Sequence, residues 1–412
     1  MSWLKEHGKA DTPQNQTIDL VLDLAQALQR CGLPSHRVEA AMERLIDALG
    51  LIGQVFIAPS SMFATFGEGA ERQTFMLRGT SGDVNLEKLD RFDRLAQQMV
   101  SGDQTVAEAR AQFCEIEQAP DRYGALLTTL CFMLSSAGAG RLFGGGWREV
   151  AASGLIGLWV GILINLAPRF EAVGRLIAPL AAVGAIVVAK LAAYWLGPMS
   201  VFIPTVTGLI VLIPGLSLTV AMTELATGHL ISGTSRLANA GVFFLLLTFG
   251  IALGGQVESL LPGEIAVGAP QPLPMWTEWV ALVGVAFSFV VLFRAHPKDA
   301  LLIFLAGVAS FTGARYGSTL LDPQLGGFLA ALFLGLLSNG FARLFKRPAA
   351  TVLVPGIMLL VPGSIGFKSM SSLLARETML GVETGFAMAI AGISLVTGLI
   401  FANVLMPPKS PF

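Results

Sequence analysis

The sequence predicts an all-α polytopic membrane protein, with about ten transmembrane helices in a 5+5 inverted repeat behind a small soluble α+β domain. Composition indicates the membrane class: 53% of the residues are hydrophobic, 13% are charged and the mean hydropathy is +0.67, whereas soluble domains carry about 25% charged residues. The charges separate the two parts, because residues 1–122 hold 12 Lys/Arg and 18 Asp/Glu, and the rest of the chain holds 15 and 10. An internal repeat predicts the 5+5 arrangement.

The repeat relates two stretches that each contain a Pro-Gly pair. One runs through Gly208, Pro214-Gly215, Gly233 and Gly250, and the other, 148 residues later without a gap, through Gly356, Pro362-Gly363, Gly381 and Gly398. Proline removes a backbone donor and glycine lets the chain leave helical geometry, so each pair predicts a broken membrane helix. Such a break persists only beside protein, water or a ligand. Breaks at matching places in two halves are typical of a secondary transporter's binding site; two ordinary kinks are the alternative.

Residues 1–122 predict a cytoplasmic domain of four helices and three short strands. Apolar residues recur on one face of the first helical stretch, Thr105-x-x-Glu108 is a capping box, and the β-rich runs are separated by turn residues. The expected helices are Thr17–Cys31, Ser35–Leu49, Leu86–Met99 and 105–118, and the expected strands are Gln54–Ala58, Met62–Phe66 and Gln73–Arg78. Eight charged or polar residues are expected on solvated helix faces: His36, Arg37, Glu39, Glu87, Asp90, Arg91, Asp93 and Arg94.

Ten apolar stretches follow, each about 18–24 residues long, which is enough to cross roughly 30 Å of hydrocarbon. Five lie in a first membrane unit, 123–255, and five in a second, 276–412, with the loop Gln256–Met275 between them. Two homologous units of five spans must have opposite orientations, as in an inverted repeat. The expected spans are 124–141, 148–167, 174–196, 201–222, 236–255, 276–294, 299–317, 325–344, 349–367 and 381–405.

The loops indicate an orientation, because cytoplasmic loops carry the excess of Lys and Arg. The loop Gln256–Met275 contains neither residue and is therefore expected in the periplasm, with the N-terminal domain in the cytoplasm. Two segments on the expected periplasmic side carry basic residues and therefore disagree with this rule. Either the expected spans are wrong there or their charges line a vestibule and serve the substrate: Arg141 and Arg148, and Lys368 and Arg376.

Lys190 lies inside the third span, about six residues from its outer end. A lysine at that depth costs roughly 2.5–3.5 kcal/mol on insertion scales. Two interpretations account for it. Lys190 binds substrate or a proton, or it extends its ammonium group to the outer headgroups beside Tyr194 and Trp195.

Ionisable residues follow both breaks. Glu224 and His229 follow the first, and Arg376, Glu377 and Glu383 follow the second. Carboxylates near a broken helix suit an ammonium group or a transported proton, and a half-helix N-terminus suits a substrate carboxylate. Glu383 is favoured because apolar residues surround it; each of these charges could instead be an ordinary one at the membrane surface. The candidate substrate-binding residues are Pro214, Gly215, Glu224, Pro362, Gly363 and Lys190, and the candidate proton-coupling residues are Glu383 and Glu224.

Several functional classes lack support in the sequence. There is no metal cluster, nucleophile elbow or Walker motif, so neither an enzyme nor an ATP-driven pump is expected, and no cofactor is implied. The net charge of −1 gives no reason to expect nucleic acid. Cys31, Cys114 and Cys131 are expected to be free thiols, and the first residues do not form a signal peptide. The segment Gly144–Glu149 reads as an interspan turn.

Several of these stretches, taken in order, resemble the threonine/serine exporter family, with its N- and C-terminal units fused. In the N-terminal domain the similar stretches are CGLPSHRVEAAMERLIDALG at Cys31–Gly50 and NLEKLDR at Asn85–Arg91. In the membrane part they are GGGWRE at Gly144–Glu149, LIPGLSLTVAMTELATGHLISGTSRL at Leu212–Leu237, which includes the first break, and VPGSIGFKSM at Val361–Met370. Glu224 departs from the family, which is expected to carry an aspartate there.

The resemblance implies proton-driven export of L-threonine and L-serine across a bacterial inner membrane. Its partners would be the amino acid or a related carboxylate, protons and the lipid bilayer; a homo-oligomer is an open alternative. Two rival functions are retained. One is export of a dicarboxylate such as succinate, bound by Lys190, Arg148 or Arg376. The other is a non-transporting membrane enzyme or scaffold that uses the N-terminal domain.

Overall fold

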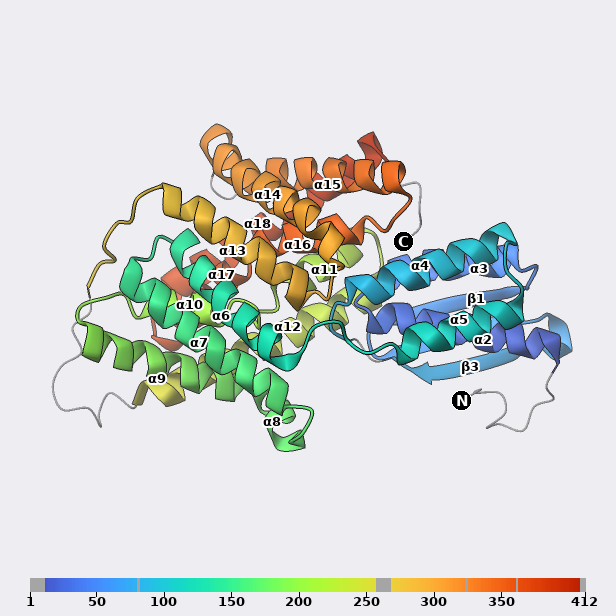
Figure 1. Cartoon of the computed structure of the whole chain (residues 1–412), viewed down its shortest axis with the longest axis horizontal. Coiled ribbons are helices and arrows are strands. Elements are labelled where there is room, and N and C mark those ends of the chain that lie inside the picture. The colour runs from blue at the N-terminus through green and yellow to red at the C-terminus, as the bar shows by residue number, and fades with distance from the viewer. Residues whose placement is uncertain (1–11, 80–81, 257–267, 323–324, 361, 408–412) are drawn as a thin grey trace.

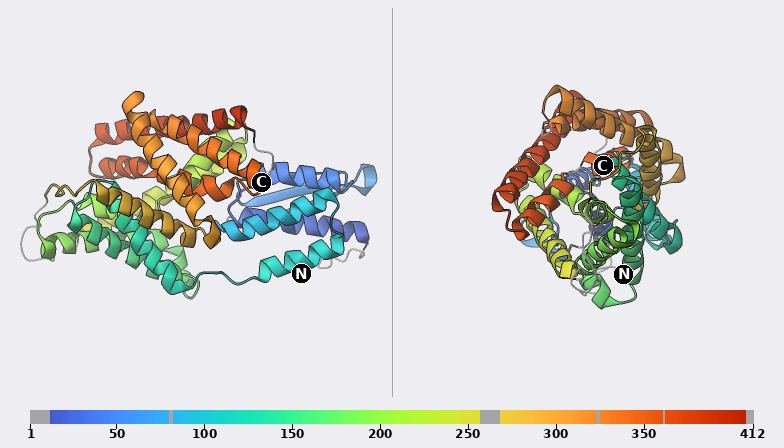
Figure 2. Two further views of the ribbon diagram at one scale, coloured as in Figure 1. Left: turned by 45° about the horizontal axis from the view of Figure 1, so that its top comes forward. Right: turned by 90° about the vertical axis from the view of Figure 1, so that its left-hand side faces the viewer.

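The computed structural model describes residues 12–79, 82–256, 268–322, 325–360 and 362–407. Figure 1 shows two parts that lie end to end along the longest axis. We call residues 12–122 the head and residues 123–407 the bundle. The bundle helices run broadly along the long axis of the molecule, as the turned view in Figure 2 also shows. Part of the predicted loop Gln256–Met275 lies outside the described residues.

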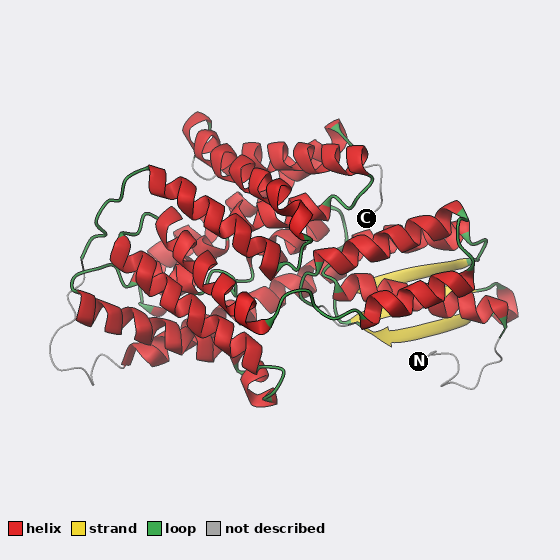
Figure 3. Ribbon diagram, viewed as in Figure 1, coloured by secondary structure: helices red, strands yellow, loops and turns green. Residues whose placement is uncertain are grey.

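The head is a three-stranded antiparallel meander covered on one face by helices (Figure 3). Alternation within the strands explains the layering, because successive side chains point to opposite faces. Val55 and Ile57 are buried, whereas Phe56 is exposed opposite Phe63 on the next strand. The elements are α2 (Pro13–Arg30), α3 (Ser35–Ala48), β1 (Gly53–Ala58), β2 (Ser61–Phe66), β3 (Gln73–Arg78), α4 (Leu86–Ser101) and α5 (Val106–Gln118).

These elements confirm the predicted order of the head, including the capping box at Thr105 and Glu108. One expectation is wrong. Asp90 and Asp93 on α4 are 6% and 0% exposed, so they do not lie on a solvated face. The helical period could not reveal this, because groups from other elements act on both carboxylates: Arg347 of the bundle pairs with Asp90, and Arg37 of α3 acts on Asp93.

Within its described residues, the bundle contains eight helical segments that are long and apolar enough to cross a membrane, together with two shorter apolar helices, α11 and α13. This is the architecture of a multi-pass membrane protein. In the first half the helices are α6 (Ala125–Leu142), α7 (Trp147–Leu166), α8 (Glu171–Arg175), α9 (Ile177–Leu196), α10 (Phe202–Gly208), α11 (Gly215–Ala226) and α12 (Leu230–Gly255). In the second half they are α13 (Trp276–Leu292), α14 (Ala300–Leu320), α15 (Gly326–Phe345), α16 (Ala350–Leu360), α17 (Gly363–Leu374) and α18 (Thr378–Leu405).

The expected spans 201–222 and 349–367 are each divided into two helices rather than continuous. The second helices of these pairs, α11 and α17, have twelve residues each and begin 148 positions apart. The helices that follow them, α12 and α18, also begin 148 positions apart. The helix bounds therefore repeat with the spacing of the sequence pattern.

Corresponding helices of the two halves run in opposite directions relative to the head. α12 begins at the head, where the hydroxyl of Ser232 donates to the carbonyl of Ile57 on β1 at 3.1 Å. α18 instead ends on the head side, where Asn403 accepts a hydrogen bond from Asn339 near the end of α15. The chain then leaves α15 through Arg347, which contacts the head.

The repeated glycines lie where helices approach closely. A Cβ at Gly250 on α12 would stand 2.7 Å from the carbonyl oxygen of Pro179 on α9. A Cβ at Gly398 on α18 would stand 2.4 Å from the carbonyl oxygen of Phe328 on α15. The two glycines thus have the same packing role in the two halves, which explains their common spacing in the sequence.

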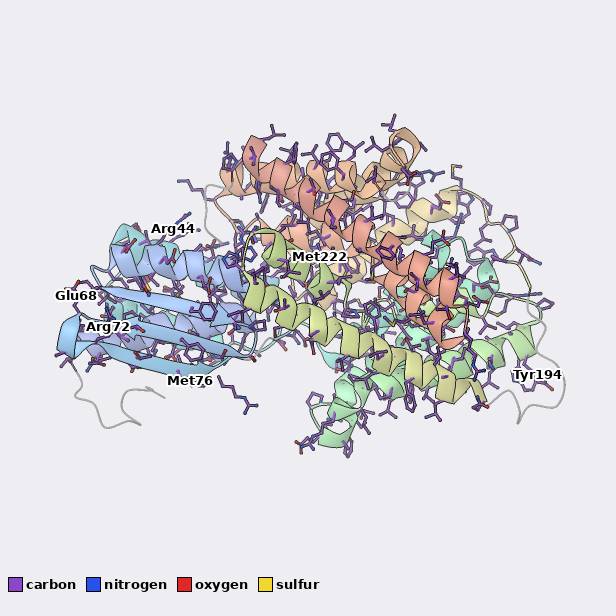
Figure 4. The ribbon with its side chains drawn as sticks, turned by 180° about the vertical axis from the view of Figure 1, so that it is seen from behind. Arg44, Glu68, Arg72, Met76, Tyr194 and Met222 are labelled. Carbon is purple, nitrogen blue, oxygen red and sulfur yellow. The ribbon has the colours of Figure 1, made fainter. Side chains whose placement is uncertain are left out.

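Exposed aromatic side chains mark the end of the bundle opposite the head. Trp147 and Trp195 lie at the start of α7 and the end of α9, and Trp276 and Trp279 lie in the first turn of α13. Figure 4 places the neighbouring Tyr194 at that end. Trp and Tyr are enriched at membrane–water interfaces, so this ring is consistent with the outer boundary of a membrane-embedded bundle.

Candidate functional site

The first break lies between α10 and α11. α10 ends at Gly208, and the chain turns through 209–214 before α11 begins at Gly215 with Pro214 as its N-cap. The Gly215 N–H donates to the carbonyl of Ile213 at 2.7 Å, a local turn rather than a helical bond. The first amides of a helix have no intrahelical acceptor. The break therefore places the N-terminus of a helix inside the bundle.

The second break lies between α16, which ends at Leu360, and α17, and residue 361 within it is outside the described residues. Gly363 begins α17 with Pro362 as its N-cap, and Gly366 N–H donates to the Pro362 carbonyl at 3.1 Å. Both Gly215 and Gly363 are buried. The structure thus forms both predicted half-helices at the predicted residues.

Each half-helix packs against the last helix of the other half. α11 contacts α18, α17 contacts α12, and α11 also contacts α17. Met222 on α11 faces Gly392 on α18, where an added Cβ would stand 2.2 Å from the Met222 sulfur. On the other side, Gly366 of α17 faces Phe244 of α12, with 3.2 Å from an added Cβ to the ring. A movement of one half relative to the other must therefore shift both breaks.

Hydroxyl groups lie close to the first break. Ser136 on α6 donates to the carbonyl of Gly208 at 3.2 Å, and Ser153 on α7 pairs with Thr207 at 2.8 Å. These bonds hold the last turn of α10 on α6 and α7. Elsewhere in the bundle, two buried hydroxyls, Ser310 on α14 and Ser371 on α17, have no hydrogen-bond partner within the described ranges.

Glu224 lies on α11 but at the head rather than at the break. Nine residues separate it from Gly215, which is about 14 Å along a helix. Its side chain is fully buried; Oε1 accepts the Ser35 N–H at 3.1 Å, and Oε2 pairs with Arg236 Nε at 3.0 Å. Since α3 has Pro34 at its N-cap position and no side-chain cap of its own, Glu224 supplies the missing acceptor from the bundle.

Two histidines and a second glutamate extend this contact. His36 Nδ1 lies 3.8 Å from Glu224 Oε1, and His229 Nε2 lies 3.7 Å from Glu39 Oε2. The expected solvated face of α3 is therefore wrong for His36 and Glu39, whose side chains pack against the bundle. Burial is the main cause that raises the pKa of Glu39 above its ordinary value, and the hydrogen bond from Ile57 N–H opposes the rise.

A second contact joins the head to the other half of the bundle. Arg347, between α15 and α16, binds both carboxylate oxygens of Asp299, at 2.6 and 2.9 Å, and Asp90 of α4 at 3.0 Å. The hydrogen bond to Asp299 raises the pKa of Arg347 above its usual range. Beside it, the Leu86 N–H at the start of α4 donates to the carbonyl of Phe293 at the end of α13, at 3.0 Å.

The other candidate residues lie apart from the two breaks. Lys190 donates to the carbonyl of Gly255 at 2.7 Å. Its positive charge there compensates the partial negative charge at the C-terminus of α12. Arg148 donates to the carbonyl of Pro198 at 2.9 Å. Glu383 is exposed on the second turn of α18, and Arg376 is exposed with a positive φ of 65° after α17.

The sequence did not predict the contact between head and bundle. Its signal was present as two short polar clusters, 35–39 and 224–236, in otherwise apolar surroundings. Nothing in one sequence pairs two such clusters that lie 189 residues apart. The part of the chain that the structure describes contains no group of three or more His, Cys, Asp or Glu side chains suited to a metal ion.

Comparison with known proteins gives two family matches that together span most of the chain. Residues 19–257 match the family described as "Putative threonine/serine exporter", and residues 278–405 match "Threonine/Serine exporter, ThrE". The division between the matches falls in the loop after α12. No solved structure matches the chain.

Similar curated proteins are yeast membrane proteins named "Pheromone-regulated membrane protein 10". The protein from Candida albicans (strain WO-1) is 25% identical over 87% of this chain and 33% of its own length. The one from Saccharomyces cerevisiae (strain YJM789) is 25% identical over 86% and 47%, and the one from Eremothecium gossypii is 26% identical over 94% and 53%. The chain thus spans between a third and about half of these relatives. By its two family matches, the chain belongs to the threonine/serine exporter family, a family of membrane transporters.

Proposed function

We propose that the protein is a secondary-active exporter of L-threonine and L-serine, built as a 5+5 inverted repeat and driven by the proton gradient. The observation that carries the proposal is the pair of half-helices α11 and α17, which begin at matching Pro-Gly pairs and pack on each other. Half-helix N-termini inside a transporter bind anionic substrate groups. Rocking of one half against the other would expose the site alternately to the two sides.

The substrate carboxylate would bind the free amides that follow Pro214-Gly215 and Pro362-Gly363. The helix macrodipoles favour negative charge at both positions. Glu383 is the residue we propose for the coupling proton. Glu224 would bind substrate or the coupling proton at the cytoplasmic end of α11. Lys190 would bind substrate at the opposite end of the bundle.

Dicarboxylate export is the second candidate, and its proposed cations argue against it. Lys190 and Arg148 are each engaged with a backbone carbonyl at the outer end of the bundle. Arg376 is exposed beyond α17. The amides at the repeated breaks suit a carboxylate of either substrate, so the preference for the amino acid rests on the family matches. A non-transporting enzyme or scaffold would leave the matched breaks without a role.

The proposed location is a bacterial inner membrane with the head in the cytoplasm. This orientation predicts opposite labelling of two exposed positions, Ala269 before α13 and Lys298 after it. Ala269→Cys should react with an impermeant thiol reagent in intact cells, whereas Lys298→Cys should react only after the membrane is opened. The reverse pattern would overturn the orientation and export as the natural direction.

Efflux from proteoliposomes tests the function. Vesicles loaded separately with radiolabelled L-threonine, L-serine or succinate should lose both amino acids when a pH gradient is imposed, and should retain succinate at the rate of protein-free vesicles. Loss of succinate alone would establish the dicarboxylate alternative. Retention of all three would exclude both transport functions.

The same vesicles test the role of Glu383. Glutamine preserves the size of the side chain but cannot titrate, so Glu383→Gln should keep exchange of labelled for unlabelled threonine and lose efflux driven by the pH gradient. Glu377→Gln is the matched control, because Glu377 precedes the same helix and is also exposed. Wild-type driven efflux in Glu383→Gln would show that this residue is structural.

A further inference from the structure

Five ionisable side chains from the head and the bundle meet at the cytoplasmic end of α11. We call them the junction cluster: His36 and Glu39 from α3, Glu224 from α11, His229 at the N-cap of α12, and Arg236 of α12. The two imidazole rings lie 5.4 Å apart between centroids. Two of the chain's 4 histidines are therefore in one contact.

The cluster is enclosed by protein on several sides. Glu224 is fully buried, the exposed fractions of the Glu39, Arg236 and His36 side chains are 15%, 15% and 21%, and His229 at the edge of the cluster is 37% exposed. β1 closes it through Ile57, whose N–H binds Glu39 and whose carbonyl accepts the Ser232 hydroxyl. Charges in such a place interact with little screening by solvent.

The charges of the cluster do not balance when both histidines are neutral. Two carboxylates, Glu39 and Glu224, then face one guanidinium, that of Arg236. Glu43 on the next turn of α3 also acts on Glu39 and makes the surroundings more negative. A buried net charge is costly. One added proton makes the cluster neutral, and each histidine has a carboxylate within 3.8 Å to stabilise the positive charge.

We propose that the junction cluster is a proton-binding site shared by the head and the bundle, which holds one proton on the His36–His229 pair when the head is docked. Docking then becomes linked to cytoplasmic pH. Two separated histidines with the usual pKa near 6.5 hold less than one proton between them above that pH. The docked state then binds more protons than the separated parts, so a rise in pH from about 6.5 to 8 weakens docking. The contact would hold the end of α11, and through that helix the first break, more firmly at about pH 6.5 than at pH 8.

This inference does not depend on transport, since it concerns the contact itself. It predicts that the amides at the start of α3 exchange more slowly with deuterium at about pH 6 than at about pH 8, on either side of the usual histidine pKa near 6.5. Hydrogen exchange would be followed by mass spectrometry on the full chain in nanodiscs, with correction for the intrinsic pH dependence. One bound proton would change protection of residues 35–38 by about tenfold over this range.

Three variants define the test. The double variant His36→Gln/His229→Gln should show equal corrected protection at both pH values, while His296→Gln, which removes a histidine outside the cluster, should keep the wild-type change. Asp93→Asn should also keep it; this control is needed because burial raises the pKa of Asp93 to about 7, and Arg37 beside His36 acts on that carboxyl. Unchanged protection in α15 shows that each variant is folded.

Two results would overturn the proposal. One is equal corrected protection of residues 35–38 at both pH values in the wild-type protein. The other is a pH-dependent change that persists in the double variant. If the double variant loses folded structure, the single variants His36→Gln and His229→Gln replace it, and each should reduce the change. None of these results bears on whether threonine is exported, so the two proposals can fail separately.

Discussion

Replacement of Gly215 or Gly363 by leucine is expected to abolish transport while leaving a folded protein in the membrane. Both glycines are buried at the first position of a half-helix. A leucine side chain there would occupy the space next to the free amides and restrict the non-helical backbone that precedes them. Driven efflux of threonine should fall to the level of protein-free vesicles in both variants.

Gly241→Leu is the matched control for this substitution. Gly241 lies within α12, and a Cβ there meets no atom within 4 Å. The same change in side-chain volume should therefore leave efflux at the wild-type rate. Normal transport by both Gly215→Leu and Gly363→Leu would mean that the repeated breaks are kinks without a part in binding.

The largest expected effect on stability is that of Arg347→Leu. The substitution leaves Asp299 without Arg347 and removes one of the two arginines that pair with Asp90, which keeps Arg94; the two aspartate side chains are only 3% and 9% exposed. Removal of one partner from a buried ion pair costs about 3–5 kcal/mol. We expect the head to separate from the bundle and the midpoint of thermal unfolding to fall by several degrees, as measured by the fluorescence of the purified protein during heating.

Arg175→Leu provides the comparison, because Arg175 pairs with Glu171 on α8 while both side chains are more than 70% exposed. Surface pairs of this kind contribute about 0–1 kcal/mol, so its unfolding midpoint should stay close to that of the wild type. A second variant, Arg347→Leu with Asp299→Leu, removes both the cation and one stranded carboxylate and should recover part of the loss. Equal midpoints for Arg347→Leu and Arg175→Leu would contradict the role given to Arg347.

The sequence predicted the elements well because each carries its own local signal. The strands alternate, the capping box at Thr105 is complete within four residues, and the bundle helices are long apolar runs. The register of the repeated glycines was also informative, since Gly250 and Gly398 make the same close helix contact in each half. Such signals need no knowledge of distant parts of the chain.

The contacts of the charged residues could not be predicted in the same way. Glu224 has the same spacing from the break whether it faces a substrate or caps α3, and only the folded structure places Ser35 against it. Asp93 looked solvated because its covering surface is not part of its own helix. Lys190 illustrates the same point, since the carbonyl of Gly255 that accepts its hydrogen bond belongs to a helix end 65 residues away.

The central claim, that substrate binds between the two breaks, is tested most directly by thiol protection. Ser217 and Ser364 lie half-buried in the first turns of α11 and α17. Each would be changed to cysteine in a Cys114→Ser background, where the native Cys31 and Cys131 are buried. L-threonine should slow the reaction of both new thiols with a small reagent by severalfold, D-threonine should not, and Ser101→Cys on the head should react at one rate throughout. An unchanged rate at both Ser217→Cys and Ser364→Cys in the presence of L-threonine would contradict the account.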